Sequence, residues 1–254
     1  MRNLELCRLA RLPRPTTIAG VVERLLAIED ALPPTHGVAA FNRLYRWTTQ
    51  NVGAAVDAGR FEAPEAMIAL DVHFADLYFD AVDAWALGGP IPTAWSPLLS
   101  RGDDPEISGL RFALAGMHAH ISRDLPVAVA SLHGEPPEED TPRFRDYVLV
   151  NRVLEETSET IRHLILPPLL NRIDAHLGEL DNHVVIGSIS AARRAAWEAA
   201  QVLWAVRERR WAWDLGVGCL DTAVGASAAV LLLEPHSPFE ATYTPALRLA
   251  VAER

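Results

Sequence analysis

Cysteine and positive charge are both scarce in this chain of 254 residues. Its two cysteines, Cys7 and Cys219, lie far apart, which excludes a disulfide framework and fits a reducing compartment. The 23 basic residues are outnumbered by 33 acidic ones, and the net charge is -10. An acidic chain is not attracted to phosphate backbones or anionic membranes, so we expect neither nucleic acid nor a membrane as a partner.

The common sequence motifs of enzyme active sites are absent as well. The chain has no Walker, Rossmann, nucleophile-elbow, His-Glu-x-x-His or paired-cysteine zinc motif. No uninterrupted apolar segment of the kind that directs secretion is found near residue 1. The one long apolar stretch, residues 215–233, contains Asp221 and three glycines, so we interpret it as a buried core helix and not a membrane span. We therefore expect a cytoplasmic protein.

What the chain does contain is a helical pattern along most of its length. Apolar residues recur at helical spacing, and no segment alternates with the period of two that is typical of a strand. We expect helices at about 17–32, 37–57, 64–87, 105–126 with a continuation to 132 after a kink at Pro126, 141–163, 169–177, 182–210 and 211–233. The sequence thus predicts an all-α fold, a single-domain bundle of about eight helices around a central buried helix bearing histidine and aspartate. A leader (1–15) and a tail (235–254) are expected at the periphery.

The predicted central helix carries the most informative polar residues. His120 and Asp124 are one turn apart and share a face, whereas His118 points roughly 200° away from His120. A histidine and an aspartate at this spacing can hold a divalent metal, or the carboxylate can fix the imidazole tautomer for acid–base chemistry. They can equally be a core histidine paired with a neighbouring carboxylate. The spacing leaves all three interpretations open.

The predicted helix at 64–87 is unusually rich in aspartate. Asp76, Asp80 and Asp83 repeat at helical spacing and are interpreted as a solvated stripe, while Asp71 lies on another side among aromatic residues. Burying a lone carboxylate is costly unless it has a partner. We therefore expect Asp71 to meet Arg43, a histidine or a metal.

The later helices show a simpler amphipathic pattern. In the segment 182–210, Trp197 and Trp204 are expected to face the core. The arginines of the same segment, including Arg193, are expected to face solvent. The sequence therefore assigns no part of the candidate site to these arginines.

Several motifs are similar to those of a known protein family. They are Phe41-Asn-Arg-Leu-Tyr45, Leu70-Asp-Val-His-Phe-Ala75, Phe112-Ala-Leu-Ala-Gly-Met117 continued by Ala119-His-Ile121, Asp124-Leu-Pro126, Asp146-Tyr147, Val150-Asn151 and Leu203-Trp204. By these motifs the chain resembles a family of uncharacterised, mainly actinobacterial proteins known as a domain of unknown function. The resemblance brings no established reaction. It implies that the family pattern shares the following residues: Asn42, Arg43, Asp71, Asp83, His120, Asp124, Asp146 and Asn151.

The chain departs from that pattern beside its central histidine. Where the family reads Asn-Ala-His-Ile-Asn, this chain reads His118-Ala-His-Ile-Ser122. The extra imidazole and the lost amide suggest a member adapted to a particular substrate, such as an intermediate of specialised metabolism. A weaker resemblance, to zinc-dependent phospholipase C and related single-strand nucleases, is confined to the His-x-x-x-Asp element of His120 and Asp124.

The first function compatible with these residues is a small-molecule enzyme with a buried site. His120, Asp124 and Asp71 would bind Zn²⁺ or Fe²⁺ for hydrolase or lyase chemistry, or would act as acid and base. The predicted catalytic residues are His120, Asp124, Asp71 and Arg43. The predicted substrate-binding residues are Asn42, Tyr45, Tyr78, Trp95, His118 and Asn151. The substrate is expected to be hydrophobic, and a homodimer is left open.

Two other functions remain compatible with the sequence. One is a metal-free cyclase or isomerase, in which His120 moves a proton in an aromatic pocket. That pocket would be lined by Phe74, Tyr78, Trp95 and Trp204. A variant resembling helical terpene synthases would bind Mg²⁺ and a diphosphate through Asp80, Asp83, Asn151, Glu155 and Glu159, although its aspartate-rich signature is incomplete here. The other is a non-catalytic binding or scaffold protein whose buried polar residues brace the helices.

Overall fold

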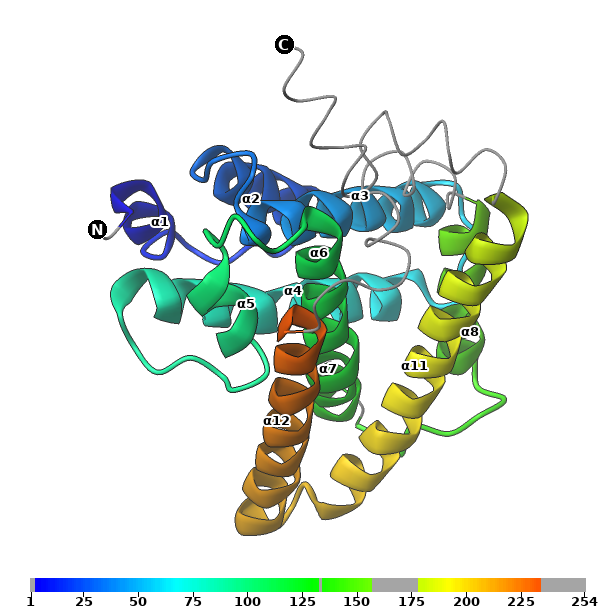
Figure 1. Cartoon of the computed structure of the whole chain (residues 1–254). Helices are drawn as coiled ribbons and strands as arrows, with labels where there is room; N and C mark the ends of the chain where they lie inside the picture. The colour runs from blue at the N-terminus through cyan, green and yellow to red at the C-terminus, as the bar shows by residue number, and fades with distance from the viewer. Residues whose placement is uncertain (1–2, 133, 157–177, 234–254) are drawn as a thin grey trace.

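Helices supply all the regular structure in the part of the chain that is described. A computed structural model describes residues 3–132, 134–156 and 178–233 (Figure 1), with only the backbone described for 178–188. The helices are α1 (Leu4–Leu9), α2 (Ile18–Asp30), α3 (Gly37–Asp57), α4 (Pro64–Leu87), α5 (Ser96–Arg101), α6 (Gly109–Ala119), the π-helical turn η1 (His120–Asp124), α7 (Leu125–Leu132), α8 (Pro142–Glu156), α11 (Gly178–Val206) and α12 (Arg210–Leu233). The predicted all-α, single-domain fold is confirmed.

Local chemistry sets several of the helix ends. The Thr17 side chain caps α2 by accepting a backbone hydrogen bond. Pro64 is the first residue of α4, and Gly88, which is left-handed with φ 74°, ends that helix. These ends lie where the sequence predicts them, because each depends on one residue and its immediate neighbours.

Other predicted segments need correction or lie beyond the described residues. The helix expected from about residue 105 begins at Gly109, because the Ser108 side chain caps it there. The predicted continuation of the 141–163 helix beyond 156, the predicted helix at 169–177 and the predicted tail (235–254) lie outside the described residues.

The N-terminal segment belongs to the core and is not a peripheral leader. It contains α1, which the Asn3 side chain caps. Leu6 and Leu9 of α1 are buried and join the main hydrophobic cluster. Asn3 also donates a hydrogen bond to the carbonyl of Ala31 at the end of α2. The segment is therefore held by both packing and hydrogen bonds.

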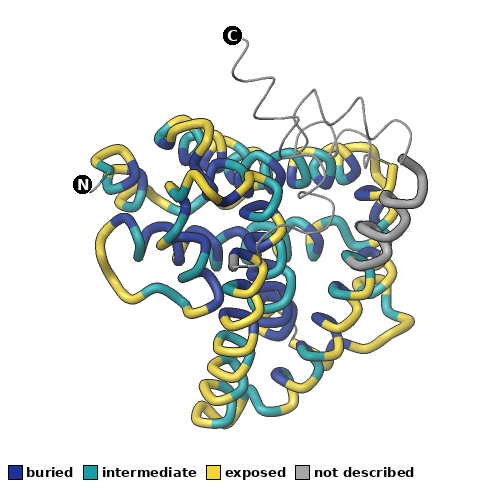
Figure 2. The backbone as a smooth tube through the Cα atoms, in the orientation of Figure 1, coloured by how far each residue is buried: buried dark blue, intermediate teal, exposed yellow. Residues whose placement is uncertain are grey.

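The bundle is organised around the rod formed by α6, η1 and α7. Figure 1 shows this rod passing through the middle of the molecule, with α11 and α12 running along it. Helices α3 and α4 pack against it from the opposite side. Figure 2 shows that the buried residues concentrate along the rod and the helix faces turned toward it. Polar residues on the rod are therefore placed in the interior.

The prediction that the last apolar stretch is a buried core helix is wrong. Val224, Ala228 and Leu232 of α12 are buried, but Trp211 is 70% exposed and Leu215 59% exposed. Only one side of α12 packs on the rod (Figure 2). By length and composition the segment Arg210–Leu232 meets the criterion for a membrane-spanning helix, a criterion that core helices of soluble proteins also meet.

Candidate functional site

The central rod widens into a π-helical turn at the predicted His/Asp pair. In η1 the N–H of Leu125 donates to the carbonyl of His120, five residues earlier instead of four. Pro126 follows directly, and its ring would clash with the carbonyl of Ser122 in an unbroken α-helix. The predicted kink therefore takes the form of a π turn, which carries His120 and Asp124 on the interior side. Turns of this kind occur frequently at functional sites.

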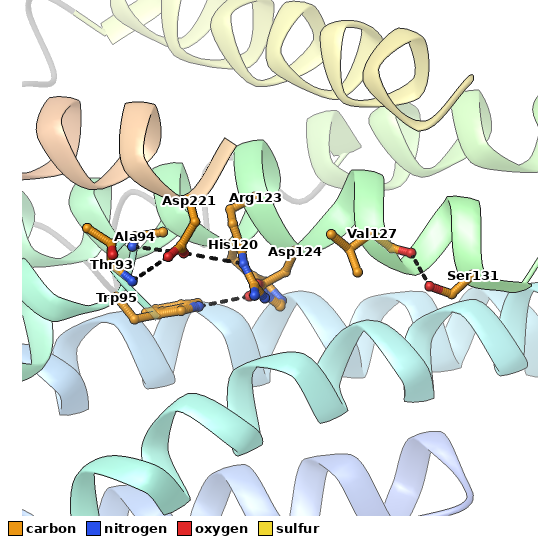
Figure 3. Close-up of polar contacts among 9 residues, drawn as sticks. All are labelled: Thr93, Ala94, Trp95, His120, Arg123, Asp124, Val127, Ser131 and Asp221. Carbon is orange, nitrogen blue, oxygen red and sulfur yellow. Dashed lines mark hydrogen bonds and ion pairs between the residues drawn. The ribbon is translucent and has the colours of Figure 1, made fainter. Parts of the chain in front are cut away.

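Asp124 is a buried carboxylate with donors on both oxygens. Its Oδ2 accepts a hydrogen bond from Trp95 Nε1 at 2.9 Å and lies 3.0 Å from Nδ1 of His120 (Figure 3). Its Oδ1 accepts from a terminal nitrogen of Arg123 at 2.7 Å. Because indole and guanidinium nitrogens only donate, Asp124 is held as an acceptor, and Nδ1 of His120 carries the proton that the two residues share.

Arg123 links the Asp124 carboxylate to α12. Nε of Arg123 lies 3.5 Å from Oδ1 of Asp221, which is on α12. The Asp221 carboxylate accepts the backbone N–H groups of Thr93 at 2.7 Å and Ala94 at 3.1 Å (Figure 3). The loop that carries Trp95 is thus anchored both at its backbone and at its indole.

His120 is enclosed by aromatic rings. Phe74 stacks on the imidazole with ring centroids 3.5 Å apart and planes 7° apart, and Tyr45 meets it edge-on at 4.4 Å. Burial lowers the pKa of His120, and the hydrogen bond to Asp124 only partly offsets that effect. His120 is therefore neutral at pH 7, with its proton on Nδ1 and a free electron pair on Nε2.

A cavity of about 100 Å³ lies beside His120. For scale, an engineered cavity of about 150 Å³ holds benzene, so this one fits a small molecule. Its polar lining residues are Tyr45, Thr48, Thr49, Asp71, His120 and Arg193. Its apolar lining residues are Phe41, Leu44, Val52, Met67, Leu70, Phe74, Met117, Ile121, Leu125, Val150, Leu154 and Ile189. The cavity thus combines a mostly apolar wall with a few polar groups, as small-molecule sites do.

Four buried polar atoms of these lining residues have no hydrogen-bond partner among the described residues. They are Nε2 of His120, Oδ2 of Asp71 and the hydroxyl oxygens of Tyr45 and Thr49. The Tyr45 and Thr49 hydroxyls lie near each other without the geometry of a hydrogen bond. Buried polar atoms are nearly always paired, and each unpaired one costs about 1–3 kcal/mol. Four at one cavity need an explanation.

Asp71 is isolated from cations in the described part of the chain. Burial raises its pKa to about 7, so the acid and the carboxylate coexist at neutral pH. Burial also raises the pKa of Tyr45, and the nearby charge of Asp71 adds to that shift. The expected contact of Asp71 with Arg43 is wrong. Arg43 instead donates to the carbonyl of Pro34 at the surface.

Arg193 forms a further part of the cavity wall. Its Nε donates to Oδ1 of Asn151 at 2.8 Å, and a terminal nitrogen donates to the carbonyl of Tyr147 at 2.7 Å. The guanidinium also lies over the Tyr147 ring, 4.3 Å from its centroid. Arg193 is only 7% exposed, so the expectation that it faces solvent is wrong. Asn151, a predicted substrate-binding residue, positions this guanidinium.

Three other predicted substrate-binding residues brace the fold and do not line the cavity. The Tyr78 hydroxyl donates to Oδ1 of Asn42 at 3.2 Å, and Nδ2 of Asn42 donates to the carbonyl of Leu25 at 2.5 Å. Trp95 is fully buried and donates to Asp124. Of the predicted substrate-binding residues, only Tyr45 is among those that line the cavity.

His118 and Ser122, the two positions expected to depart from the family pattern, contact each other away from the cavity. Ser122 Oγ lies 3.2 Å from Nδ1 of His118, and Nε2 of His118 lies 2.6 Å from Oγ of Ser227 on α12. His118 therefore joins the rod to α12, while His120 faces the opposite side. His118 and Ser122 therefore form one contact, and neither lines the cavity.

The structure does not assemble the predicted metal sites. No group of three or more His, Cys, Asp or Glu side chains with ligand geometry occurs in the described ranges. Both oxygens of Asp124 face N–H donors, and Asp71 does not join them. The magnesium variant fails on contacts as well, because Asp83 pairs with Arg24 and Asp80 with Arg14, while Glu159 lies outside the described residues.

Sequence reasoning missed three polar residues of the cavity, Thr48, Thr49 and Arg193. Thr49 follows Tyr45 by one helical turn, so the spacing from Tyr45 could have identified it. Arg193 gave no such signal, because its neighbours in sequence are ordinary surface residues, including the exposed Arg194. Its burial results from packing between α11 and α8.

The chain belongs to a protein family described as "Family of unknown function (DUF5995)", which matches residues 18–234. The predicted membership of a domain-of-unknown-function family is thereby confirmed. No curated protein and no solved structure matches the chain. The case for a function therefore depends on the cavity and its polar groups.

Proposed function

We propose that this protein is an enzyme that binds a small, largely apolar molecule beside His120 and moves a proton on it. The supporting observation is the set of four buried polar atoms at one cavity that lack partners among the described residues. Such atoms destabilise the free protein and are explained when a ligand completes their hydrogen bonds. Isomerases, cyclases and lyases are the reaction classes that need this chemistry.

His120 acts as the general base of the proposed site. Its imidazole is neutral because burial lowers its pKa, and Asp124 holds the proton on Nδ1. The free electron pair of Nε2 then accepts a proton from the substrate. The Asp124 carboxylate stabilises the imidazolium that forms, as a carboxylate does in other histidine-based sites.

Asp71 acts as the second proton-transfer group. A carboxyl group with a pKa of about 7 can donate and accept a proton with similar ease at neutral pH. The hydroxyls of Tyr45 and Thr49 orient a polar group of the substrate, and the apolar wall positions the rest. Two acid–base groups at one cavity allow a proton to be taken at one position and returned at another.

A purely structural role explains the polar groups less well. A brace requires paired atoms, and the groups around Asp124 meet that requirement. Four polar atoms at the cavity do not meet it, because they have no hydrogen-bond partner among the described residues. The metal-assisted form of the enzyme hypothesis has less support, because the described residues supply no set of three ligands.

Solvent-proton exchange tests the proposal without a known substrate. The wild-type protein is incubated in D₂O with mixtures of small metabolites, and deuterium incorporation and new products are followed by mass spectrometry and NMR. We expect at least one compound to exchange or convert. We expect His120→Gln and Asp71→Asn to lower that rate by about 10²–10⁴-fold, the usual contribution of one acid–base group.

Arg43→Gln is the matched control, because Arg43 lies at the surface and does not line the cavity. It should keep the wild-type rate. Conversion that persists in folded His120→Gln would contradict the assigned base. A protein that binds compounds at the cavity without exchanging or converting any of them would be a binding protein and not an enzyme.

A further inference from the structure

Arg193 is a buried cation that no carboxylate of the described residues neutralises. Its side-chain hydrogen bonds go to neutral oxygens, the Asn151 amide and the Tyr147 carbonyl. No ion pair joins it to any acidic residue in the described part of the chain, although the neighbouring Arg194 pairs with two glutamates. Burial lowers the pKa of Arg193, and the one ionisable group that opposes this is Tyr147. A guanidinium nevertheless stays charged at neutral pH.

An unneutralised cation in the interior is costly, and it is retained where an anion completes it. A guanidinium has five N–H groups, and hydrogen bonds to the described residues use two of them in Arg193. The remaining three N–H groups lie on the two terminal nitrogens. One N–H from each terminal nitrogen can bind the two oxygens of a carboxylate. Asn151 and the Tyr147 ring fix the plane of the group in advance.

The location of Arg193 connects this charge to the proposed reaction. Arg193 on α11 and His120 on η1 line the same cavity, which apolar residues such as Phe74, Leu70 and Val150 also line. Asp71 lines it too, but no ion pair joins it to Arg193. The cavity thus offers a cation, an apolar wall and a proton acceptor to one small molecule.

We propose that the molecule bound at the cavity is a small monocarboxylate, whose carboxylate binds Arg193 and whose apolar body extends toward His120. This identification of the substrate class rests on the proposed function. A single cation matches a single negative charge, whereas a phosphate group carries close to two. Because the cavity of about 100 Å³ is smaller than the cavity of about 150 Å³ that holds benzene, we expect a ligand smaller than benzene.

Matched acids and amides test the charge requirement directly. Straight-chain, branched and aromatic monocarboxylates of increasing size, from propionate to benzoate, are titrated into the protein by calorimetry beside their primary amides. The amides keep the shape of the acids and lose the charge. We expect at least one acid to bind at least tenfold more tightly than its amide. Equal binding of every acid and its amide, or no binding by any acid, would overturn the proposal.

Variants at position 193 then locate the charge. Arg193→Gln should weaken binding of the acid at least tenfold and abolish its advantage over the amide. Arg193→Lys keeps the charge and should retain the preference for the acid. This variant still tests the proposal if Arg193→Gln does not fold. Arg194→Gln is the control, since Arg194 is next in sequence but half exposed on the surface. If Arg193→Gln and Arg194→Gln bind the acid equally well, the proposal is wrong.

The same titrations separate this proposal from the catalytic one. Folded His120→Gln should still bind the acid, because its charge contact is with Arg193. Binding that depends on Arg193 without any turnover supports the carboxylate site and contradicts the enzyme. If the protein turns over a neutral compound and Arg193→Gln does not change that rate, the enzyme is supported and the carboxylate site is contradicted.

Discussion

The two ring nitrogens of His120 face two regions of opposite character. On the Nδ1 side, Asp124 accepts from His120, Trp95 and Arg123, and Asp221 extends the contacts to α12. On the Nε2 side, four buried polar atoms of the cavity lining have no partner among the described residues. Both regions are buried and both contain an aspartate. Burial alone therefore does not tell a structural polar group from a functional one, whereas hydrogen bonding does.

The difference predicts opposite responses to mutation. Removing a paired buried group leaves its partners unsatisfied and destabilises the protein. Removing an unpaired group relieves a cost that the free protein carries, and it affects ligand binding or turnover instead. Three substitutions test this contrast.

The largest effect is expected for Asp124→Ala. It leaves the Arg123 cation, the Trp95 indole and the His120 imidazole without their acceptor, a loss of about 3–5 kcal/mol in the free energy of unfolding. Urea denaturation measures it. Asp80→Ala is the control, because the ion pair of Asp80 with Arg14 is exposed and should be worth less than about 1 kcal/mol. If the two variants lose similar amounts of unfolding free energy, the buried contacts of Asp124 are worth no more than a surface ion pair and the contrast fails.

Asp71→Asn is expected to change the pH dependence of stability. Burial raises the pKa of Asp71 in the folded protein to about 7, from 3.8 in the unfolded chain. The stability that comes from binding this proton is therefore complete below about pH 4 and is lost as the pH rises through 7. The variant lacks that loss, so above pH 7 it should be more stable than wild type by roughly 2–4 kcal/mol.

Thermal or urea unfolding of both proteins between pH 4 and 8 checks the prediction for Asp71. The difference between the two curves isolates this residue from the other groups that titrate in the same range. A variant less stable than wild type at pH 8 would show that the ionised form of Asp71 has a stabilising partner.

The smallest effect is expected for Tyr45→Phe. The Tyr45 hydroxyl has no partner among the described residues, so its removal should change the free energy of unfolding by less than about 1 kcal/mol, in the stabilising direction. Tyr78→Phe makes the same chemical change where the hydroxyl does have a partner, Asn42, and should cost about 1 kcal/mol or more. Calorimetric unfolding compares the two variants. Equal costs would mean that the two hydroxyls are equally well satisfied.

Much of the fold could be predicted because it depends on short-range chemistry. Helical spacing and single capping residues such as Thr17, Pro64 and Gly88 place the ends of α2 and α4. The spacing of four residues between His120 and Asp124 predicts that they share a face, and the structure joins them at 3.0 Å. Each of these features is decided within about one helical turn.

The errors concern features that depend on distant parts of the chain. The sequence 215–233 is apolar enough for a core helix, yet nothing in it shows that only one side of α12 meets the rod. Arg193 and Arg194 are adjacent and chemically identical, but α8 covers one and leaves the other exposed. Arg43 was assigned to the site by its charge and by the family pattern, and its helix places it at the surface.

By itself, then, the sequence determined the helices, the family and the pairing of His120 with Asp124, because spacing and capping act over a few residues. Only the tertiary structure decided which polar groups are satisfied. Asp71 on α4, Tyr45 and Thr49 on α3, and His120 on η1 come to one cavity because these three separate helical elements pack around it. Whether a buried atom finds a partner depends on what those helices bring within about 3 Å, and no local pattern records that distance.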